Sequence, residues 1–216
     1  MMHHENELLK KLKAISLNDT GGSNEELASF LAKTESITGI HSIRVSGYTV
    51  MTAREIGLPE ELIASLHVSS LLHDIGKLLI SHDILYKTGR LSAEETALIQ
   101  QHPLQGSSML KKIERYRQYS DIVLYHHEFF NGQGYPHGLS GSDIPLLSRI
   151  IAVADAYEAM TSDRPYRKGF SHREAVNRLR ISRHIQWDPD IIDSFLRAIK
   201  GFSSSSGIKK GTINQL

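Results

Sequence analysis

Seven residues of this chain have the types and order expected of ligands in a site for two metal ions. They are His41, the adjacent pair His73 and Asp74, His102, the adjacent pair His126 and His127, and Asp155. Imidazole and carboxylate ligands together suit divalent transition metals better than calcium or magnesium. Two such ions close together activate a water molecule and stabilise the attacking and leaving oxygens at a phosphorus centre. These residues therefore predict metal-assisted hydrolysis of a phosphate ester.

The pair His73 and Asp74 lies between apolar segments, with Ser69–Leu72 before it and Leu78–Ile80 after it. Neighbours within a regular helix point about a third of a turn apart, but at a helix end before a glycine both can turn toward one cluster. Because a buried charge must be paired or coordinated, the flanks favour ligation. Lys77 follows and could neutralise a phosphate oxygen at the same place.

Each candidate ligand also has an ordinary explanation when taken alone. His41 could be a satisfied core histidine, and one of His126 and His127 a packing residue. Asp155, however, is the one charge within 150–156, and a buried carboxylate without a partner is costly. Five or more independent coincidences would be needed to explain the whole set, so a metal site is the better interpretation.

The composition is that of a soluble globular protein, and 216 residues suit one domain with a substantial core. The chain has no cysteine, so any metal must be held by His, Asp or Glu. No apolar run reaches the length of a membrane span, and Met1–Lys13 is too charged for a signal peptide, which predicts a cytoplasmic protein. A net charge of +1 indicates neither nucleic acid nor a membrane as a partner.

Nearly every segment has a helical pattern and no strand series is visible, so the predicted fold class is all-α. Capping boxes are expected at Ser23 with Glu26 and at Ser92 with Glu95, and Ser171 with Glu174 has the same spacing. The other helices are expected through Leu8–Ile15, through His41 to Gly57, from Pro59 through His73 and Asp74 to a break at Gly76, over Ile122–His127, from Pro145 to Met160 and from Pro189. The glycine-rich stretch Asn131–Gly141 is expected to be a loop.

Three strings in this order are similar to the signature of the HD-GYP family, a branch of the HD-domain phosphohydrolases. They are His73-Asp74-Ile75-Gly76-Lys77, His126-His127-Glu128 and Asn131-Gly132-Gln133-Gly134-Tyr135-Pro136. The resemblance covers about Thr34 to Pro189 and implies a helical bundle with a central metal site. It divides the chain into an N-terminal helical segment over 1–33, a catalytic domain over 34–200 and a disordered tail over 201–216.

The resemblance implies hydrolysis of the bacterial second messenger cyclic di-GMP to the linear dinucleotide pGpG, to GMP, or to both. Two divalent ions are implied, iron or manganese first, with zinc, cobalt and nickel as further candidates. One ion would take His41, His73, Asp74 and Asp155, and the other Asp74, His102, His126 and His127. A hydroxide bridging the ions would be the nucleophile.

The resemblance also assigns residues to the substrate. Asp74 and Lys77 are the implied catalytic residues, and Lys77 would steady the scissile phosphate. Tyr135 lies in the signature loop that shapes the site. The basic residues Arg164, Arg167 and Lys168 match positions that contact the phosphates or guanines, consistent with an anion clamp read from their charge alone.

One departure concerns the number of ions. Many members read Glu-Thr-Gly-x-His at the first histidine, and that glutamate helps to hold a third metal. Here the string is Ile37-Thr38-Gly39-Ile40-His41, and Glu35 lies on another face of the helix. Ile37 cannot ligate, so two ions rather than three are predicted, and the second step from pGpG to GMP could be less efficient.

Two other functions stay open. One is an HD phosphohydrolase for another cyclic dinucleotide, such as cyclic GMP-AMP, or for another nucleotide, and the intact Gly134-Tyr135-Pro136 hardly argues against cyclic GMP-AMP. The other is a non-catalytic module that senses a cyclic dinucleotide or docks a signalling protein through the GYP loop, and the complete ligand set with Lys77 argues against it. The apolar stripe Leu8–Ile15 could pack on the core or mediate a homodimer, and packing is the simpler interpretation.

Overall fold

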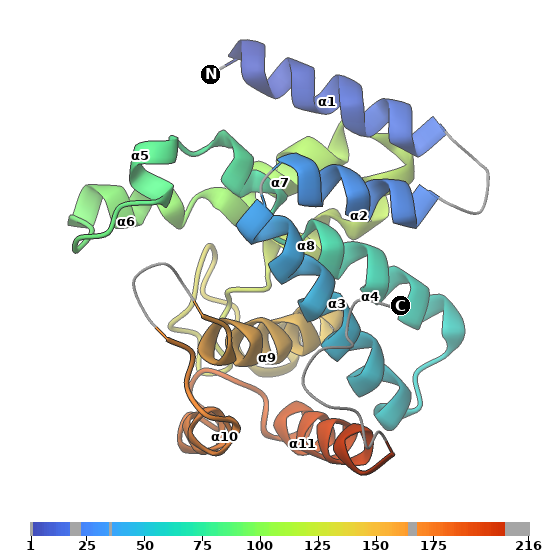
Figure 1. Ribbon diagram of the computed structural model, residues 1–216, viewed down its shortest axis with the longest axis vertical. Coiled ribbons are helices and arrows are strands. Elements are labelled where there is room, and N and C mark those ends of the chain that lie inside the picture. The colour runs from blue at the N-terminus through green and yellow to red at the C-terminus, as the bar shows by residue number, and fades with distance from the viewer. Residues whose placement is uncertain (1, 18–22, 35, 164–167, 206–216) are drawn as a thin grey trace.

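The computed structural model describes residues 2–17, 23–34, 36–163 and 168–205, and every regular element in these ranges is a helix. Figure 1 shows α1 across one end of the molecule and α10 and α11 at the other, with α3 and α4 running between them. The predicted all-α fold class is confirmed. Within the described residues, no helix is long and apolar enough to cross a membrane.

The helical elements follow one another along the chain in a fixed order. They are α1 (Met2–Leu17), α2 (Ser23–Thr34), α3 (Ser36–Ile56), α4 (Glu60–Leu72), η1 (Ile75–Leu79), α5 (His82–Leu85), α6 (Ala93–Ile99), α7 (His102–Lys111), η2 (Glu114–Tyr119), α8 (Ser120–Leu124), η3 (Gly141–Asp143), α9 (Leu146–Thr161), α10 (His172–Ile181) and α11 (Pro189–Ser205).

Helix ends agree with the predicted signals at several points. Ser92 and Glu95 form both halves of a capping box, and the Ser171 hydroxyl accepts a hydrogen bond from the Glu174 backbone N–H at 3.2 Å. The side chain of Ser23 lies outside the described residues. Capping groups satisfy backbone N–H groups that the first helical turn leaves without partners.

Two predicted boundaries were wrong. The helix expected over Ile122–His127 ends at Leu124, so His126 and His127 lie in the turn that follows α8. The last helix continues to Ser205, past residue 200, where a disordered tail was expected to begin. Residues 206–216 lie outside the described part of the chain.

Two apolar clusters flank the centre of the bundle, and α4 contributes to both. Its Ile63 and Leu66 pack with residues of α3, α9, α10 and α11, whereas its Leu71 and Leu72 pack with α1, α2, α7 and α8. Helix α4 therefore brings His73 and Asp74, which directly follow its last residue Leu72, to the junction between the clusters.

The N-terminal stripe belongs to the second cluster. Leu8, Leu9 and Leu12 are buried, with Leu12 fully inaccessible, and they pack among residues of α2, α4 and α7. Burial of several leucines stabilises the fold by about 1.5–3 kcal/mol per side chain relative to exposure. The stripe is thus used inside the fold, which supports packing over the homodimer hypothesis for these residues.

Candidate metal centre

The structure brings all seven residues predicted as metal ligands together at the junction of the two apolar clusters. They form two groups in which the candidate ligand atoms lie within 4.8 Å of one another. The first group holds His41 of α3, His73 at the end of α4 and Asp155 of α9. The second holds Asp74, His102 of α7, His126 and His127. Segments that are distant in sequence therefore meet at a single polar centre within a mainly apolar interior.

Asp74 lies between the two groups and presents one carboxylate oxygen to each. Its Oδ2 lies 3.3 Å from His73 Nε2 and 3.7 Å from His41 Nε2. Its Oδ1 lies 3.2 Å from His102 Nε2 and 4.0 Å from His126 Nε2. The backbone of Asp74, with φ −98° and ψ 7°, leaves the helical path here, which allows both His73 and Asp74 to face the centre.

Three of the histidines are oriented by backbone carbonyls at helix ends. Nδ1 of His73, His102 and His126 lies 2.7, 2.8 and 2.6 Å from the carbonyl oxygen three residues earlier. These carbonyls belong to the last turns of α4, α6 and α8, where helical partners are missing. Since Nδ1 must donate its proton to the carbonyl, Nε2 is the nitrogen with a lone pair, and it points into the centre.

This tautomer leaves lone pairs that face one another. His102 Nε2 and His126 Nε2 are 3.4 Å apart, and Asp74 Oδ1 also faces His102 Nε2 with no proton between them. Asp74 Oδ1 and His73 Nε2 have no hydrogen-bond partner among the described residues, although both are buried. Converging acceptors without donors repel unless a cation lies among them, so this donor set fits a divalent metal.

Burial and neighbouring histidines keep the second group of imidazoles neutral. Burial lowers the pKa of His127 to about 3, and His102 adds to the effect. Burial holds the pKa of His126 well below its usual range, and the neighbouring imidazoles add to the effect because a positive charge on two of them at once would be repelled; burial also lowers the pKa of His102. Neutral imidazole is the form that binds a metal.

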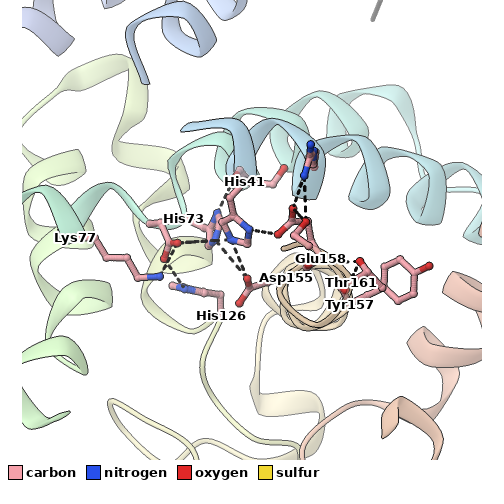
Figure 2. Close-up of polar contacts among 12 residues, drawn as sticks. His41, His73, Lys77, His126, Asp155, Tyr157, Glu158 and Thr161 are labelled. Carbon is pink, nitrogen blue, oxygen red and sulfur yellow. Dashed lines mark hydrogen bonds and ion pairs between the residues drawn. The ribbon is translucent and has the colours of Figure 1, made fainter. Parts of the chain in front are cut away.

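His41 has a different environment, because two carboxylates of α9 bracket its ring. Nε2 lies 3.0 Å from Asp155 Oδ1, and Nδ1 lies 2.5 Å from Glu158 Oε2 (Figure 2). Burial acts to lower the pKa of His41, but the hydrogen bonds to Asp155 and Glu158 outweigh it and raise the pKa to about 9. The raised pKa favours the protonated ring at neutral pH, and a metal at Nε2 would compete with that proton.

The carboxylates of Asp74, which is buried, and of Asp155, which is partly buried, are both ionised. Burial favours the protonated form of Asp74, but the positive charge around it, including the Lys77 ammonium 2.7 Å from Oδ2, holds its pKa well below its usual range. Burial likewise opposes ionisation of Asp155, whereas the hydrogen bond and charge of His41 lower its pKa strongly. Ionised carboxylates and neutral imidazoles form a complementary ligand set.

Lys77 reaches the centre from η1, one turn after Asp74. Its Nζ donates to Asp74 Oδ2 at 2.7 Å, and its side chain is 24% exposed (Figure 2). The close approach of η1 to α7 depends on Gly76, because a Cβ there would lie 2.0 Å from the His102 carbonyl oxygen. Gly76 thus allows Asp74 and His102 to share the centre.

The predicted GYP loop covers the second group. The Tyr135 ring stacks on His127 with ring centroids 5.0 Å apart, and the Tyr135 backbone N–H donates to the His127 carbonyl at 3.2 Å. A Cβ at Gly134 would lie 2.1 Å from the Phe129 nitrogen, so the loop can lie this close only with glycine there. Sequence predicted Tyr135 near the site, and the structure brings it there.

Glu128 anchors this loop through hydrogen bonds to its backbone. It is 3% exposed, and its Oε1 accepts hydrogen bonds from the backbone N–H groups of His137 and Gly138 at 2.7 and 3.1 Å. Glu128 directly follows His126 and His127 in sequence. It therefore connects the turn that carries these two histidines to His137 and Gly138 at the end of the loop. No role was predicted for it from sequence beyond membership of the motif.

Replacement of Glu128 by alanine is expected to loosen the loop. Loss of the acceptor leaves two backbone N–H groups without a partner, at a cost of about 1–3 kcal/mol. Amide hydrogen exchange at His137 and Gly138 should become roughly 10-fold faster or more. Exchange measured by NMR or mass spectrometry checks this, with Glu128→Gln, which keeps an acceptor oxygen, as the control. Equal exchange in the alanine variant and the wild type would contradict the anchoring role.

The basic residues predicted to contact substrate are only partly described. Lys168 is exposed, and Arg164 and Arg167 lie outside the described residues. The base of their segment is well defined, because the Gly169 N–H donates to Asp163 Oδ1 at 2.8 Å and the Phe170 N–H donates to the Met160 carbonyl at 2.8 Å. The segment therefore starts and ends beside the C-terminal end of α9.

Sequence reasoning missed Glu158, which contacts His41 directly, and its neighbours Arg44 and Ser162. A usable signal was present, because Glu158 follows Asp155 by three residues. Residues three apart on a helix share a face, so the side chain of Glu158 could have been expected to face the same cluster as Asp155.

Comparison with known proteins places these observations in a family. A family model described as an HD domain matches residues 23–191. A cyclic di-GMP phosphodiesterase of Pseudomonas aeruginosa is 39% identical over 173 residues, which cover 78% of this chain and 41% of that protein. A 3'3'-cGAMP-specific phosphodiesterase of Vibrio cholerae is 34% identical over 162 residues, which cover 75% of this chain and 35% of that protein.

A solved structure shows the same fold. The HDG"Y"P protein from Bdellovibrio bacteriovorus aligns with a TM-score of 0.65 at 19% identity, covering 91% of this chain and 70% of that one. The chain spans less than half the length of the two curated relatives. The similarity therefore concerns the helical domain that carries the metal centre.

Proposed function

The chain belongs to the HD domain family, in the HD-GYP branch that its motifs indicated, and from this premise we propose that it is a metal-dependent phosphodiesterase that hydrolyses cyclic di-GMP to pGpG, to GMP, or to both. The observation that carries the proposal is the position of Asp74, whose two oxygens face two separate groups of imidazoles. This arrangement suits a pair of ions joined by one carboxylate.

The proposed centre holds two divalent ions, with iron or manganese first. His41, His73 and Asp155 with Asp74 would hold one ion, and His102, His126 and His127 with Asp74 the other. When bound, such ions lower the pKa of water and stabilise negative charge at a phosphate. The limit of two ions rests on Ile37, whose side chain lies outside the described residues, and so on sequence alone.

The protein's own groups would orient the substrate. Lys77 brings an ammonium to the edge of the centre, where it can bind a non-bridging phosphate oxygen. Tyr135 offers a ring held against His127, and Lys168 an exposed cation at the segment that also carries Arg164 and Arg167. These cations would bind the second phosphate, and the buried imidazoles exclude bulk water from the ligand atoms.

Cyclic GMP-AMP is the main alternative substrate. The relative from Vibrio cholerae is named for that activity and resembles this chain nearly as closely as the cyclic di-GMP enzyme does. Both molecules present two phosphodiesters in a ring, so the metal centre does not discriminate between them. Discrimination would require contacts with a base.

The test is hydrolysis by protein purified anaerobically, with bound iron, manganese and zinc counted per chain. About two ions per chain and conversion of cyclic di-GMP to pGpG or GMP are expected, with loss of activity after chelation and recovery with manganese. Parallel rates with cyclic GMP-AMP at equal concentration rank the substrates. Two ions without turnover of either substrate would sink the proposal and favour a sensor module.

Three further expectations concern the location of the protein, a signalling partner and a homodimer. A cytoplasmic location follows from a cyclic dinucleotide substrate and is tested by cell fractionation. Docking of a signalling protein on the GYP loop stays a hypothesis, and so does a homodimer. Size-exclusion chromatography with light scattering tests the homodimer directly.

A further inference from the structure

Four histidines of the metal centre have a hydrogen-bond partner at Nδ1, and they are held in two different ways. His73, His102 and His126 lie at helix ends and donate from Nδ1 to a carbonyl three residues earlier. His41 lies within α3 (Ser36–Ile56), where the helix uses the preceding carbonyls for its own hydrogen bonds. Its ring must therefore be oriented by a side chain from another element.

Glu158 of α9 provides that side chain. Its Oε2 lies 2.5 Å from His41 Nδ1, and the residue is 3% exposed. Asp155, one turn earlier on the same face of α9, lies 3.0 Å from Nε2 of the same ring. Figure 2 shows the His41 ring directed at both carboxylates, so each nitrogen has its own carboxylate partner.

The second oxygen of Glu158 is also held. Glu158 Oε1 accepts a hydrogen bond from the Ser162 hydroxyl and lies 3.4 Å from Nη1 of Arg44. Arg44 in turn donates to the Ser162 hydroxyl oxygen at 3.1 Å. Arg44 lies on α3, three residues after His41, so the carboxylate is fixed between two helices and by partners on both oxygens.

We propose that Glu158 is a positioning residue that sets the tautomer and the orientation of His41, so that Nε2 is directed at the first metal position. The inference rests on the metal centre of the proposed function. The carboxylate of Glu158 contacts His41, Arg44 and Ser162, and it acts on the metal position through His41. A carboxylate behind a ligating imidazole also raises the basicity of that imidazole.

The contact with Ser162 also connects Glu158 to the chain that follows α9. Ser162 directly precedes Asp163, whose Oδ1 accepts a hydrogen bond from the Gly169 N–H at 2.8 Å, and the Phe170 N–H donates to the Met160 carbonyl of α9 at 2.8 Å. Glu158 thus joins His41 to Ser162, just beyond the C-terminal end of α9.

The decisive test measures metal binding without substrate. In Glu158→Gln, which keeps the shape and removes the charge, the affinity for one of two Mn²⁺ ions is expected to fall roughly 10- to 100-fold, with the other ion much less affected. Titration calorimetry of chelator-treated protein resolves the two steps. Co²⁺ absorption spectra of the same protein report the altered first site.

Glu55→Gln is the matched control, because Glu55 lies on α3 and pairs with Arg197 at 2.7 Å on the surface. It should bind both ions like the wild type. Ser162→Ala removes one partner of Glu158 and should weaken the first ion by less than Glu158→Gln does. These controls separate loss of the contact with His41 from loss of any surface pair.

The outcomes distinguish this inference from the proposed function. Two ions bound by Glu158→Gln with wild-type affinities would overturn the positioning role and leave the phosphodiesterase proposal intact. A lower melting temperature with unchanged affinity per folded chain would assign Glu158 a purely structural role. Failure of the wild type to bind two ions would overturn both.

Discussion

Replacement of Asp74 by alanine is expected to remove both ions and to reduce hydrolysis below detection. Asp74 is the one residue of the described set that faces both groups, with Oδ2 near His73 and His41 and Oδ1 near His102 and His126. Without it each group loses its shared anion, and the neutral imidazoles of the second group have no negative charge to offset a dication. Metal content by mass spectrometry and turnover of cyclic di-GMP check the prediction.

The stability of the variant gives an independent readout. In the wild type at a metal concentration near 100 times the dissociation constant, binding adds about 2.7 kcal/mol per ion. For a chain of this size that corresponds to a rise in melting temperature of roughly 5–10 °C. Asp74→Ala should show no such rise, whereas Asp121→Asn, an exposed carboxylate paired with Lys111 at 3.6 Å, should rise normally. Full metal content and activity in Asp74→Ala would refute the bridging assignment.

Much of the centre could be predicted because only a few residue types, here His and Asp, can act as metal ligands in this chain. His73 and Asp74 at the end of an apolar helix, and Asp155 as a lone charge in an apolar one, are costly unless they are coordinated. The structure places His102, His126 and His127 in one group with Asp74, and His41, His73 and Asp155 in the other, with Asp74 Oδ2 facing the second of these groups from 3.3 and 3.7 Å. The helices could be predicted from capping residues and periodicity, since these signals are local.

What could not be predicted depends on contacts between distant segments. Periodicity did not show that α8 stops at Leu124, because the turn is set by packing of the histidines against Asp74 and Tyr135 rather than by a breaking residue. The role of Glu158 depends on how α9 lies beside α3. The hydrogen bond between the His137 backbone N–H and Glu128 joins residues nine positions apart in sequence, and no local sequence pattern predicts it.

Replacement of Lys77 by alanine is expected to slow hydrolysis by roughly 10²- to 10³-fold while leaving metal content unchanged, because one positive group aimed at the developing phosphate charge is lost. Lys77 is no ligand, and its ammonium lies 2.7 Å from Asp74 Oδ2, at the edge of the centre. Removing a positive charge beside two cations relieves repulsion, so metal affinity should stay the same or rise. Lys77→Arg should recover part of the rate, since it keeps the charge but not the shape.

The contrast between rate and metal content decides what Lys77 does. Lys111→Ala, which removes an exposed ammonium far from the ligand atoms, serves as the control and should keep both quantities. If Lys77→Ala lost its ions, the residue would act by holding Asp74 in place rather than by binding the phosphate. Unchanged turnover in a fully loaded variant would show that the metal ions alone neutralise the phosphate, because no other property of Lys77 would then be needed for the reaction.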